Sequence, residues 1–412
     1  MKNQKLIGPI SQLITMRALP LRGALSDDQL EIIPNAGIWI KNDKIEAIGS
    51  FESLRKQVDW NYTSRKFLEG NYVALPGFID CHTHICFGGS RAKDFTLRNA
   101  GKSYLEISKA GGGIWDTVQQ TRALSVFALA KKTFDHAQRH LSEGVTTIEV
   151  KSGYGLSVSE EIKMLSAIQK TNNRTAADLI PSCLAAHALP RDFEGNKTEY
   201  IREITEKLLP IIHKEKLCNR VDAFVEQSAF NPEEVLPYFK KAKELGFDIT
   251  VHADQFSTGG SKLAIEIGAA SADHLEASGK EEIQRLAQSN TIGVALPGAS
   301  IGLGCGFTPA RQLLDQGGIL AIASDWNPGS APMGDLLTQA SILATFEKLT
   351  TAEVFAGITF RAAATLKLSD RGTLTPGQLA DFNLFPTSDY REILYQQGKM
   401  KPEMVWKNGK RV

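Results

Sequence analysis

The feature that most constrains the fold is a regular alternation of short apolar runs with longer amphipathic stretches through the middle of the chain. The apolar runs are expected to be strands because they are short, rich in apolar and β-branched residues, and bounded by polar segments. They cover residues 77–81, 145–151, 180–187, 221–226, 248–253, 271–275, 291–296 and 319–324. Stretches with helical periodicity lie between most of them, such as 125–143, 159–171, 232–246 and 333–347.

Eight strands alternating with helices over about 250 residues predict an α/β chain folded as a (β/α)8 barrel of the TIM type. A doubly wound open sheet is the structural alternative. No G-x-G-x-x-G or Walker A loop follows any of the predicted strands, and this weakens the alternative. The glycine-rich stretch 302–306 has the wrong spacing for a phosphate-binding motif and is expected to be a loop.

The two ends of the chain carry strand and hairpin patterns instead. Residues 38–48 read as a strand, a polar turn and a second strand, and residues 404–412 centre on Asn408-Gly409, a strong hairpin signal. Because an isolated hairpin is only marginally stable, we expect both ends to pack together in one small composite β-sandwich. The predicted domains are therefore 1–75 and 371–412 for the sandwich and 76–370 for the barrel.

Charge and hydropathy exclude several classes of partner. Lysine plus arginine (47) nearly balances aspartate plus glutamate (46), so no bulk field favours nucleic acid or an anionic membrane. The first 13 residues have too little apolar length for a signal peptide, and no later run approaches 18 uninterrupted apolar residues. We expect a cytoplasmic protein with neither a nucleic-acid nor a membrane partner.

The five cysteines do not form a recognisable site. No C-x-x-C pair occurs, so neither a zinc ribbon nor a thioredoxin-like site is indicated. Cys81 and Cys86 flank two histidines but are expected to be small buried apolar residues.

Polar residues are concentrated where the predicted strands end. In a (β/α)8 barrel the carboxyl ends of the strands converge on one mouth, which is where such barrels carry their active sites. The residues at or just beyond these ends are His82, His84, Lys151, His187, Glu226, His252, His274 and Asp325.

Four of these residues form a candidate metal site. Side chains at positions i and i+2 of an extended strand share a face, so His82 and His84 can bind one ion together. His252 and Asp325 complete a set of three imidazoles and one carboxylate, which suits zinc or iron and leaves a position for water. By contrast, His136 and His140 have the spacing of half a metalloprotease motif but lack its glutamate, because Ala137 stands there. They are expected on a solvated helix face, as is His213.

The segment Pro76-Gly77-Phe78-Ile79-Asp80-Cys81-His82-Thr83-His84 resembles the first-strand signature of the amidohydrolase superfamily. Residues 377–384 are similar to the return of that superfamily's chain into its β-sandwich. The resemblance implies a (β/α)8 barrel whose mouth holds one or two metal ions.

Five further segments resemble the imidazolonepropionase family, and the likeness covers essentially the whole chain. They are 87–91, 151–155, 186–190, 252–255 and 324–330. This resemblance implies an enzyme of histidine degradation that hydrolyses 4-imidazolone-5-propanoate to N-formimidoyl-L-glutamate. It also suggests a homodimer.

Carried over to this chain, the resemblance implies one zinc or iron ion held by His82, His84, His252 and Asp325. The substrate-binding residues that it implies are Arg91, Tyr154, His187, Gln255, Asn327, Gly329 and Ser330. A guanidinium can bind the propionate carboxylate in a bidentate manner. In two-metal relatives a carbamylated lysine bridges the ions, but Lys151 precedes Ser152-Gly153-Tyr154-Gly155, as in one-metal members. We therefore expect it to be unmodified.

Two residues are candidates for the catalytic roles. Asp325 is expected to shuttle the proton and His274 to stabilise the oxyanion, whereas the amide of Gln255 has no proton-accepting role near pH 7. Two rival functions stay open at this point. One is a deaminase of the same superfamily, although such enzymes typically show H-x-x-E where this chain has Gln255. The other is a non-enzymatic barrel that only binds a metal or ligand.

Overall fold

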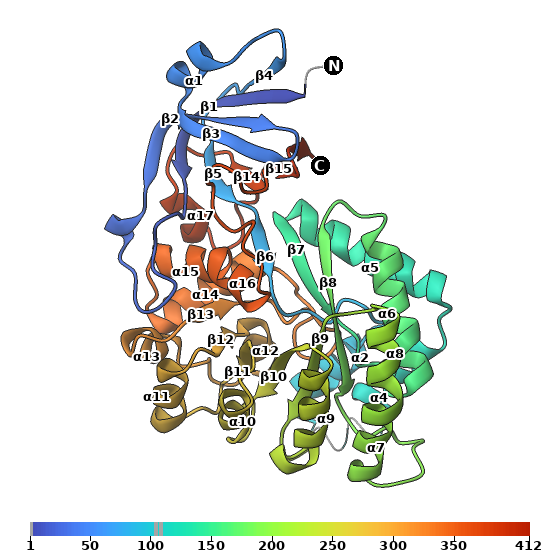
Figure 1. Cartoon of the computed structure of the whole chain (residues 1–412). Coiled ribbons are helices and arrows are strands. Elements are labelled where there is room, and N and C mark those ends of the chain that lie inside the picture. The colour runs from blue at the N-terminus through green and yellow to red at the C-terminus, as the bar shows by residue number, and fades with distance from the viewer. Residues whose placement is uncertain (1–2, 103–105, 107–109) are drawn as a thin grey trace.

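The structure is a computed structural model that describes residues 3–102, 106 and 110–412. It contains two separate eight-stranded sheets, and the larger body below the N- and C-termini in Figure 1 is the barrel. All adjacent strands of the barrel sheet pair in parallel, in sequence order from β6 to β13. The strands are β6 (Phe78–Asp80), β7 (Val145–Lys151), β8 (Asp178–Ala186), β9 (Arg220–Val225), β10 (Asp248–Ala253), β11 (Ser271–His274), β12 (Ile292–Ala295) and β13 (Leu320–Ile322). The predicted barrel is confirmed, with every predicted strand in place.

The barrel closes just beyond the ends of its first and last strands. The backbone N–H of Asp325 donates to the carbonyl of His82 at 3.0 Å, and that of His84 donates to the carbonyl of Trp326 at 2.9 Å. An isolated parallel bridge pairs Thr83 with Trp326. An open doubly wound sheet would leave these two edges apart, so that alternative is wrong.

Helices surround the barrel sheet (Figure 1). They are α2 (Ala92–Asn99), α4 (Ile114–Arg122), α5 (Val126–Ser142), α6 (Val158–Asn172), α7 (Lys197–Glu203), α8 (Leu209–Lys214), α9 (Pro232–Glu244), α10 (Gly260–Glu266), α11 (Lys280–Gln288), α12 (Pro297–Leu303), α13 (Ala310–Asp315), α14 (Leu336–Glu347), α15 (Thr351–Gly357) and α16 (Phe360–Thr365). A π-helical turn, Ile204–Leu208, joins α7 to α8. Two of the longest helices begin at side-chain caps that satisfy free backbone N–H groups, Ser125 before α5 and Asn231 before α9. None of the helices within the described ranges is long and apolar enough to cross a membrane.

The two chain ends form the second sheet, which is mixed. Its strands are β1 (Gln4–Ile14), β2 (Ile32–Lys41), β3 (Lys44–Ser50), β4 (Thr63–Phe67), β5 (Val73–Pro76), β14 (Phe382–Phe385), β15 (Met404–Lys407) and β16 (Lys410–Arg411). The short helices α1 (Phe51–Gln57) and α17 (Arg391–Tyr395) and a 3-10 turn at Asp27–Gln29 complete the elements of the terminal regions. β5 pairs antiparallel with β14, and this joins the N-terminal strands to the C-terminal hairpin. All eight strands are hydrogen-bonded into one sheet over an apolar cluster of its own.

The junction between the sheet and the barrel is short and is held by polar contacts. Gly77 separates β5 from β6, and its N–H donates to the carbonyl of Asp381 at 2.9 Å. The buried ammonium of Lys407 contacts Asp381 at 2.6 Å and Asp178 of the barrel at 2.7 Å. These contacts fix the strand β6, and with it the two histidines that follow. The domain limits at 75/76 and 370/371 stay a prediction.

The placement of two histidines corrects an expectation. His140 is fully buried, with Nε2 3.2 Å from Asp80, and His136 is half-buried and makes a 2.8 Å hydrogen bond with the carbonyl of Ile85. Helix α5 turns this face toward the barrel and Trp326, whose ring lies 4.7 Å from that of His140. The solvated-face prediction was wrong because a helix that packs against a barrel buries one side whatever polar residues it carries. His213 on α8 is exposed, as predicted.

Candidate active site

A cavity of about 540 Å³ opens at the carboxyl ends of the barrel strands. It is lined by all the predicted metal, catalytic and substrate-binding residues except His82, which lies beneath it. Those lining residues are His84, Arg91, Tyr154, His187, His252, Gln255, His274, Asp325, Asn327, Gly329 and Ser330. Barrel closure is what brings them together, because they come from segments up to 246 residues apart in sequence.

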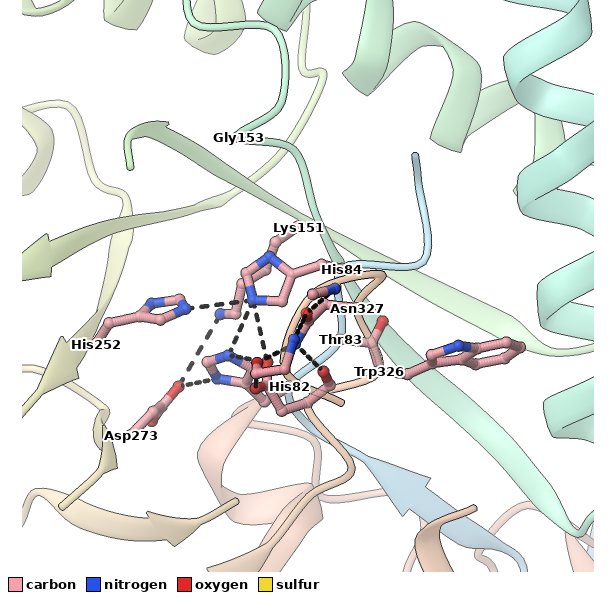
Figure 2. Close-up of polar contacts among 12 residues, drawn as sticks. His82, Thr83, His84, Lys151, Gly153, His252, Asp273, Trp326 and Asn327 are labelled. Carbon is pink, nitrogen blue, oxygen red and sulfur yellow. Dashed lines mark hydrogen bonds and ion pairs between the residues drawn. The ribbon is translucent and has the colours of Figure 1, made fainter. Parts of the chain in front are cut away.

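Three imidazoles converge at the floor of the cavity (Figure 2). The Nε2 atom of His84 lies 3.3 Å from Nε2 of His82 and 3.3 Å from Nε2 of His252. Oδ1 of Asp325 is 3.3 Å from Nε2 of His84 and 3.6 Å from Nε2 of His82. Four atoms held tetrahedrally at about 2.0–2.2 Å from one ion lie about 3.3–3.6 Å apart. These four donor separations therefore fit ligands of one small metal ion.

Two buried carboxylates orient these imidazoles. The Nδ1 atom of His82 is 2.7 Å from Oδ2 of Asp273, and Nδ1 of His252 is 2.8 Å from Oδ2 of Asp222. Such partners direct Nε2 toward the ion and strengthen it as a ligand. The sequence interpretation missed both aspartates. Both could have been noticed as acidic residues inside strands that were expected to be buried, Asp222 in β9 and Asp273 in β11.

The imidazoles are suited to be neutral ligands. Burial is the main cause that lowers the pKa of His82 and His84 well below the ordinary histidine value, and it lowers the pKa of His252 to about 3. A neutral ring has a free lone pair on Nε2 for a metal ion.

His274 lies in the same group of donors but has a different environment. It combines with His82 and Asp325 in a second set of possible ligands. Its Nδ1, however, faces Oε1 of Glu276 at 3.4 Å. Burial opposes protonation of His274, but Glu276, Asp325 and Asp273 together outweigh it and raise the pKa of the imidazole. This environment suits a hydrogen-bond donor better than a ligand.

Lys151 is fully buried beneath the histidines, within a cluster of acids. Its Nζ lies 2.9 Å from Glu149, 2.8 Å from Asp222 and 4.0 Å from Asp273. Burial opposes the positive charge, but these carboxylates together outweigh it and raise the pKa of Lys151. A carbamate would place a further negative charge among three acids, so the surroundings favour an unmodified ammonium.

Asp325 lies three residues beyond the end of β13 and has a backbone φ of 52°, which is unusual for a residue with a side chain. Its Oδ2 is 3.4 Å from the hydroxyl of Ser330. Burial raises the pKa of the carboxyl, while the nearby His274 and His252 oppose that shift.

Arg91 is the residue that precedes α2, and it lines the cavity. Its Nε donates to Oδ2 of Asp94 at 2.8 Å, which fixes the plane of the guanidinium. Gly329 leaves room for it, because a Cβ there would collide with Nη1 of Arg91. The glycine at 329 thus admits Arg91 to the site.

Two rings form one wall of the cavity. Tyr154 and His187 are buried or nearly so, with ring centroids 5.5 Å apart, and His187 stacks on His84 at 5.6 Å. The imidazole of His187 is held by a 2.9 Å hydrogen bond with the carbonyl of Gly153, and burial lowers its pKa.

Asn327 organises the loop beside the metal ligands. Its amide nitrogen donates to the carbonyl of Asp325 at 2.7 Å, and its Oδ1 accepts from the N–H groups of Gly329 and Ser330 at 2.7 and 2.8 Å. Glu226 has a similar role on the opposite side, because it accepts the N–H groups of Phe256 and Ser257 and so fixes the turn after Gln255.

Comparisons with known proteins agree with this arrangement. The family model described as the amidohydrolase family matches residues 73–412. A curated imidazolonepropionase of Bdellovibrio bacteriovorus is 38% identical over 99% of this chain and 96% of its own. That of Paracoccus denitrificans is 40% identical over 89% and 92%. The chain belongs to the imidazolonepropionase family of the amidohydrolases.

Solved structures support the fold. A triazine hydrolase variant superposes with a TM-score of 0.75 at 16% identity, covering 99% of this imidazolonepropionase-family chain and 94% of its own. An adenosine deaminase from Xanthomonas campestris with bound zinc gives 0.72 at 17%, covering 99% and 92%. At these identities the likeness concerns the fold alone, and zinc in the second structure shows what that neighbour binds.

Proposed function

We propose that this cavity hydrolyses the ring amide of 4-imidazolone-5-propanoate to give N-formimidoyl-L-glutamate. The chain is a hydrolase that acts on carbon–nitrogen bonds in cyclic amides, as the family to which it belongs indicates. The observation that carries the proposal is that the guanidinium of Arg91 and three of the four proposed metal ligands, His84, His252 and Asp325, face the same cavity. A flat ring with an acidic side chain meets both in one orientation.

The residues that would hold the ion are His82, His84, His252 and Asp325. We propose one ion per chain, zinc in the first instance and iron as the alternative, because imidazole and carboxylate ligands suit either. When bound, such an ion supplies Lewis acidity and lowers the pKa of water to about 7. Lys151 supports the one-ion assignment, since it is occupied by three carboxylates and is not free to bridge a pair.

Asp325 is proposed to move the proton. Its carboxylate lies at the junction of the metal ligands and the cavity, where it can accept a proton from the attacking water. Attack at the ring carbonyl forms a new C–O bond, and the bond from that carbon to the adjacent ring nitrogen then breaks. Asp325 returns the proton to the departing nitrogen, so a carboxylate and a formimidoyl group result.

His274 is proposed to stabilise the oxyanion. It lines the cavity, and Glu276 favours its protonated, donating form. Arg91 would bind the propionate carboxylate, while Tyr154 and His187 would contact the ring face. Gln255 and Ser330 would add hydrogen bonds, and Asn327 and Gly329 would shape the loop that bears Ser330.

The test is the loss of imidazolonepropionate absorbance with purified protein of known metal content. Turnover of this substrate with release of N-formimidoylglutamate is the expected result. Ammonia release from guanine, cytosine or adenosine, without turnover of imidazolonepropionate, would instead identify a deaminase. Metal binding without any turnover would point to a binding protein.

We also propose a homodimer in the cytoplasm, on the strength of the family resemblance. Light scattering during size-exclusion chromatography measures the assembly, and a single-chain mass of 45.0 kDa would contradict the dimer.

A further inference from the structure

One wall of the cavity carries more positive charge than its acids neutralise. Helix α2 contributes Arg98 to this wall, in addition to Asp94, and Arg91 directly precedes the helix. Lys102 lines the same cavity a few residues later. Of the three cationic residues Arg91, Arg98 and Lys102, Arg91 alone has a role in the proposed reaction.

The acids near this wall are already engaged. Asp94 is buried, and its Oδ2 accepts from both Nε of Arg91 and the N–H of Gly113, each at 2.8 Å. Lys102 forms a 3.0 Å ion pair with Glu106. Asp94 makes no hydrogen bond with Nη2 of Arg98.

Arg98 has a donor without a partner. Its Nη2 is shielded from solvent and makes no hydrogen bond with any residue that the structure describes. A shielded guanidinium N–H that stays unpaired destabilises the folded state, because it has lost its hydration without compensation. Burial, followed by the nearby charge of Arg91, lowers the pKa of Arg98. Both features are relieved when an anion binds between the two arginines.

The helix geometry allows them to share one anion. Arg91 is the N-cap residue of α2 and Arg98 lies in its last turn, so the two positions are about two turns, or roughly 10 Å, apart along the helix. Two extended arginine side chains can bridge that separation and meet at a carboxylate between them. The ring of Phe95 lies 5.9 Å from the guanidinium carbon of Arg98 and supports it from the side.

We propose that Arg98 is a second carboxylate-binding residue, which with Arg91 selects substrates whose side chain ends in an anion. The proposal rests on the proposed function and deepens it. Arg98 is a specificity-determining residue rather than a catalytic one, because its contacts are with the substrate side chain and not with the ring that reacts. A neutral side chain would leave both guanidinium groups without a counter-charge.

The first experiment measures binding and does not depend on turnover. Imidazole-4-propionate has the same side chain but no ring carbonyl to hydrolyse, and imidazole-4-propanamide is its neutral counterpart. Calorimetry compares the two ligands on the metal-loaded wild type, Arg98→Met and Arg98→Lys. We expect Arg98→Met to weaken the acid roughly 10- to 100-fold and the amide less than about threefold, with Arg98→Lys between the wild type and Arg98→Met.

Lys93→Met is the matched control, because Lys93 is exposed on the same helix and does not line this cavity. It should leave both affinities unchanged. Equal losses for the acid and the amide in Arg98→Met would indicate a structural role and overturn the proposal, as would no loss at all. Arg98→Lys guards against misfolding, since it retains the charge and the length of the side chain.

The second experiment measures the reaction. In Arg98→Met we expect KM for imidazolonepropionate to rise roughly 10- to 100-fold with kcat within about threefold of the wild type. A fall in kcat with KM unchanged contradicts the assignment. If the wild type does not turn over imidazolonepropionate, the proposed function fails, while the binding comparison still decides whether Arg98 selects an anionic side chain.

Discussion

The backbone N–H of Asp325 donates to the carbonyl of His82 at 3.0 Å, and Oδ1 of Asp325 lies 3.6 Å from Nε2 of His82. One contact closes the barrel, and the other brings two proposed metal ligands together. A shift in either strand end would therefore change the metal site and the closure of the sheet at once. The geometry of the site is thus tied to the most constrained part of the fold.

The first prediction concerns metal stoichiometry. Wild-type protein should contain one ion per chain by elemental analysis, and His84→Ala should lose both the ion and activity, since His84 contacts the other donors most closely. His213→Ala, at an exposed position of α8, is the control and should keep both. Two ions per chain with a carbamylated Lys151 would refute the one-ion assignment, and activity after complete metal loss would make the site structural.

The second prediction concerns the proton shuttle. Asp325→Asn should abolish turnover even in preparations that retain metal, because an amide cannot accept a proton near pH 7. Gln255→Glu should retain substantial activity, since the residue is proposed only to orient the ring. Both are measured as kcat with metal content determined on the same sample. Near wild-type turnover in metal-loaded Asp325→Asn would transfer the role to His274.

The third prediction concerns Arg91. Arg91→Lys keeps the charge but loses the planar contact to Asp94 and to a carboxylate, so transition-state binding should weaken by roughly 2–4 kcal/mol. The measurement is kcat/KM for imidazolonepropionate. Arg55→Lys, on the exposed surface of α1, serves as the control for the exchange itself. Unchanged kinetics in Arg91→Lys would remove it from the substrate site.

The fourth prediction concerns the carboxylate behind His82. Asp273→Asn should weaken metal binding about 10- to 100-fold, because the 2.7 Å contact with Nδ1 no longer orients and strengthens the imidazole. Competition with a chelator of known affinity measures the change. Asp135→Asn, exposed on α5, should match the wild type. Unaltered metal affinity would show that the packing of β6 alone fixes His82.

The fifth prediction concerns pH and stability. Asp335 caps α14 through Thr338 and forms an ion pair with Lys401. Burial opposes ionisation, but these contacts outweigh it and lower the pKa of Asp335 in the folded state. The carboxylate of Asp335 therefore stabilises the fold fully above the pKa of the unfolded state, about 3.9. This stabilisation is lost as the pH falls through the lower pKa of the folded state.

Asp335→Asn keeps a capping oxygen but loses the charge, so it should be less stable by about 1 kcal/mol at pH 7. The difference from the wild type should shrink as the pH falls below about 4. Urea unfolding at pH 7 and pH 3 provides the comparison, with the exposed Asp43→Asn as control. A difference of the same size at both pH values would mean that the ion pair is not its origin.

Much of this protein could be predicted from local sequence patterns. Short-range patterns in the sequence predict the barrel strands and the C-terminal hairpin at Asn408-Gly409. They also predict the polar residues at the strand ends, and the structure contains all three features. The ligand set could be proposed for the same reason, because its members stand at or just beyond the carboxyl ends of three strands, β6, β10 and β13. Their roles stay predictions.

The tertiary structure decided what surrounds those residues. Several features depend on contacts between segments that are distant in sequence. They are the burial of His140, the three acids around Lys151, the pairing of Asp222 and Asp273 with imidazoles, and the unpaired Nη2 of Arg98. A residue's position in a strand or helix specifies which way its side chain points but not what it meets there. The sequence by itself therefore determined the barrel and its candidate ligands, whereas closure of the barrel determined their neighbours, because only closure places β6 against β13.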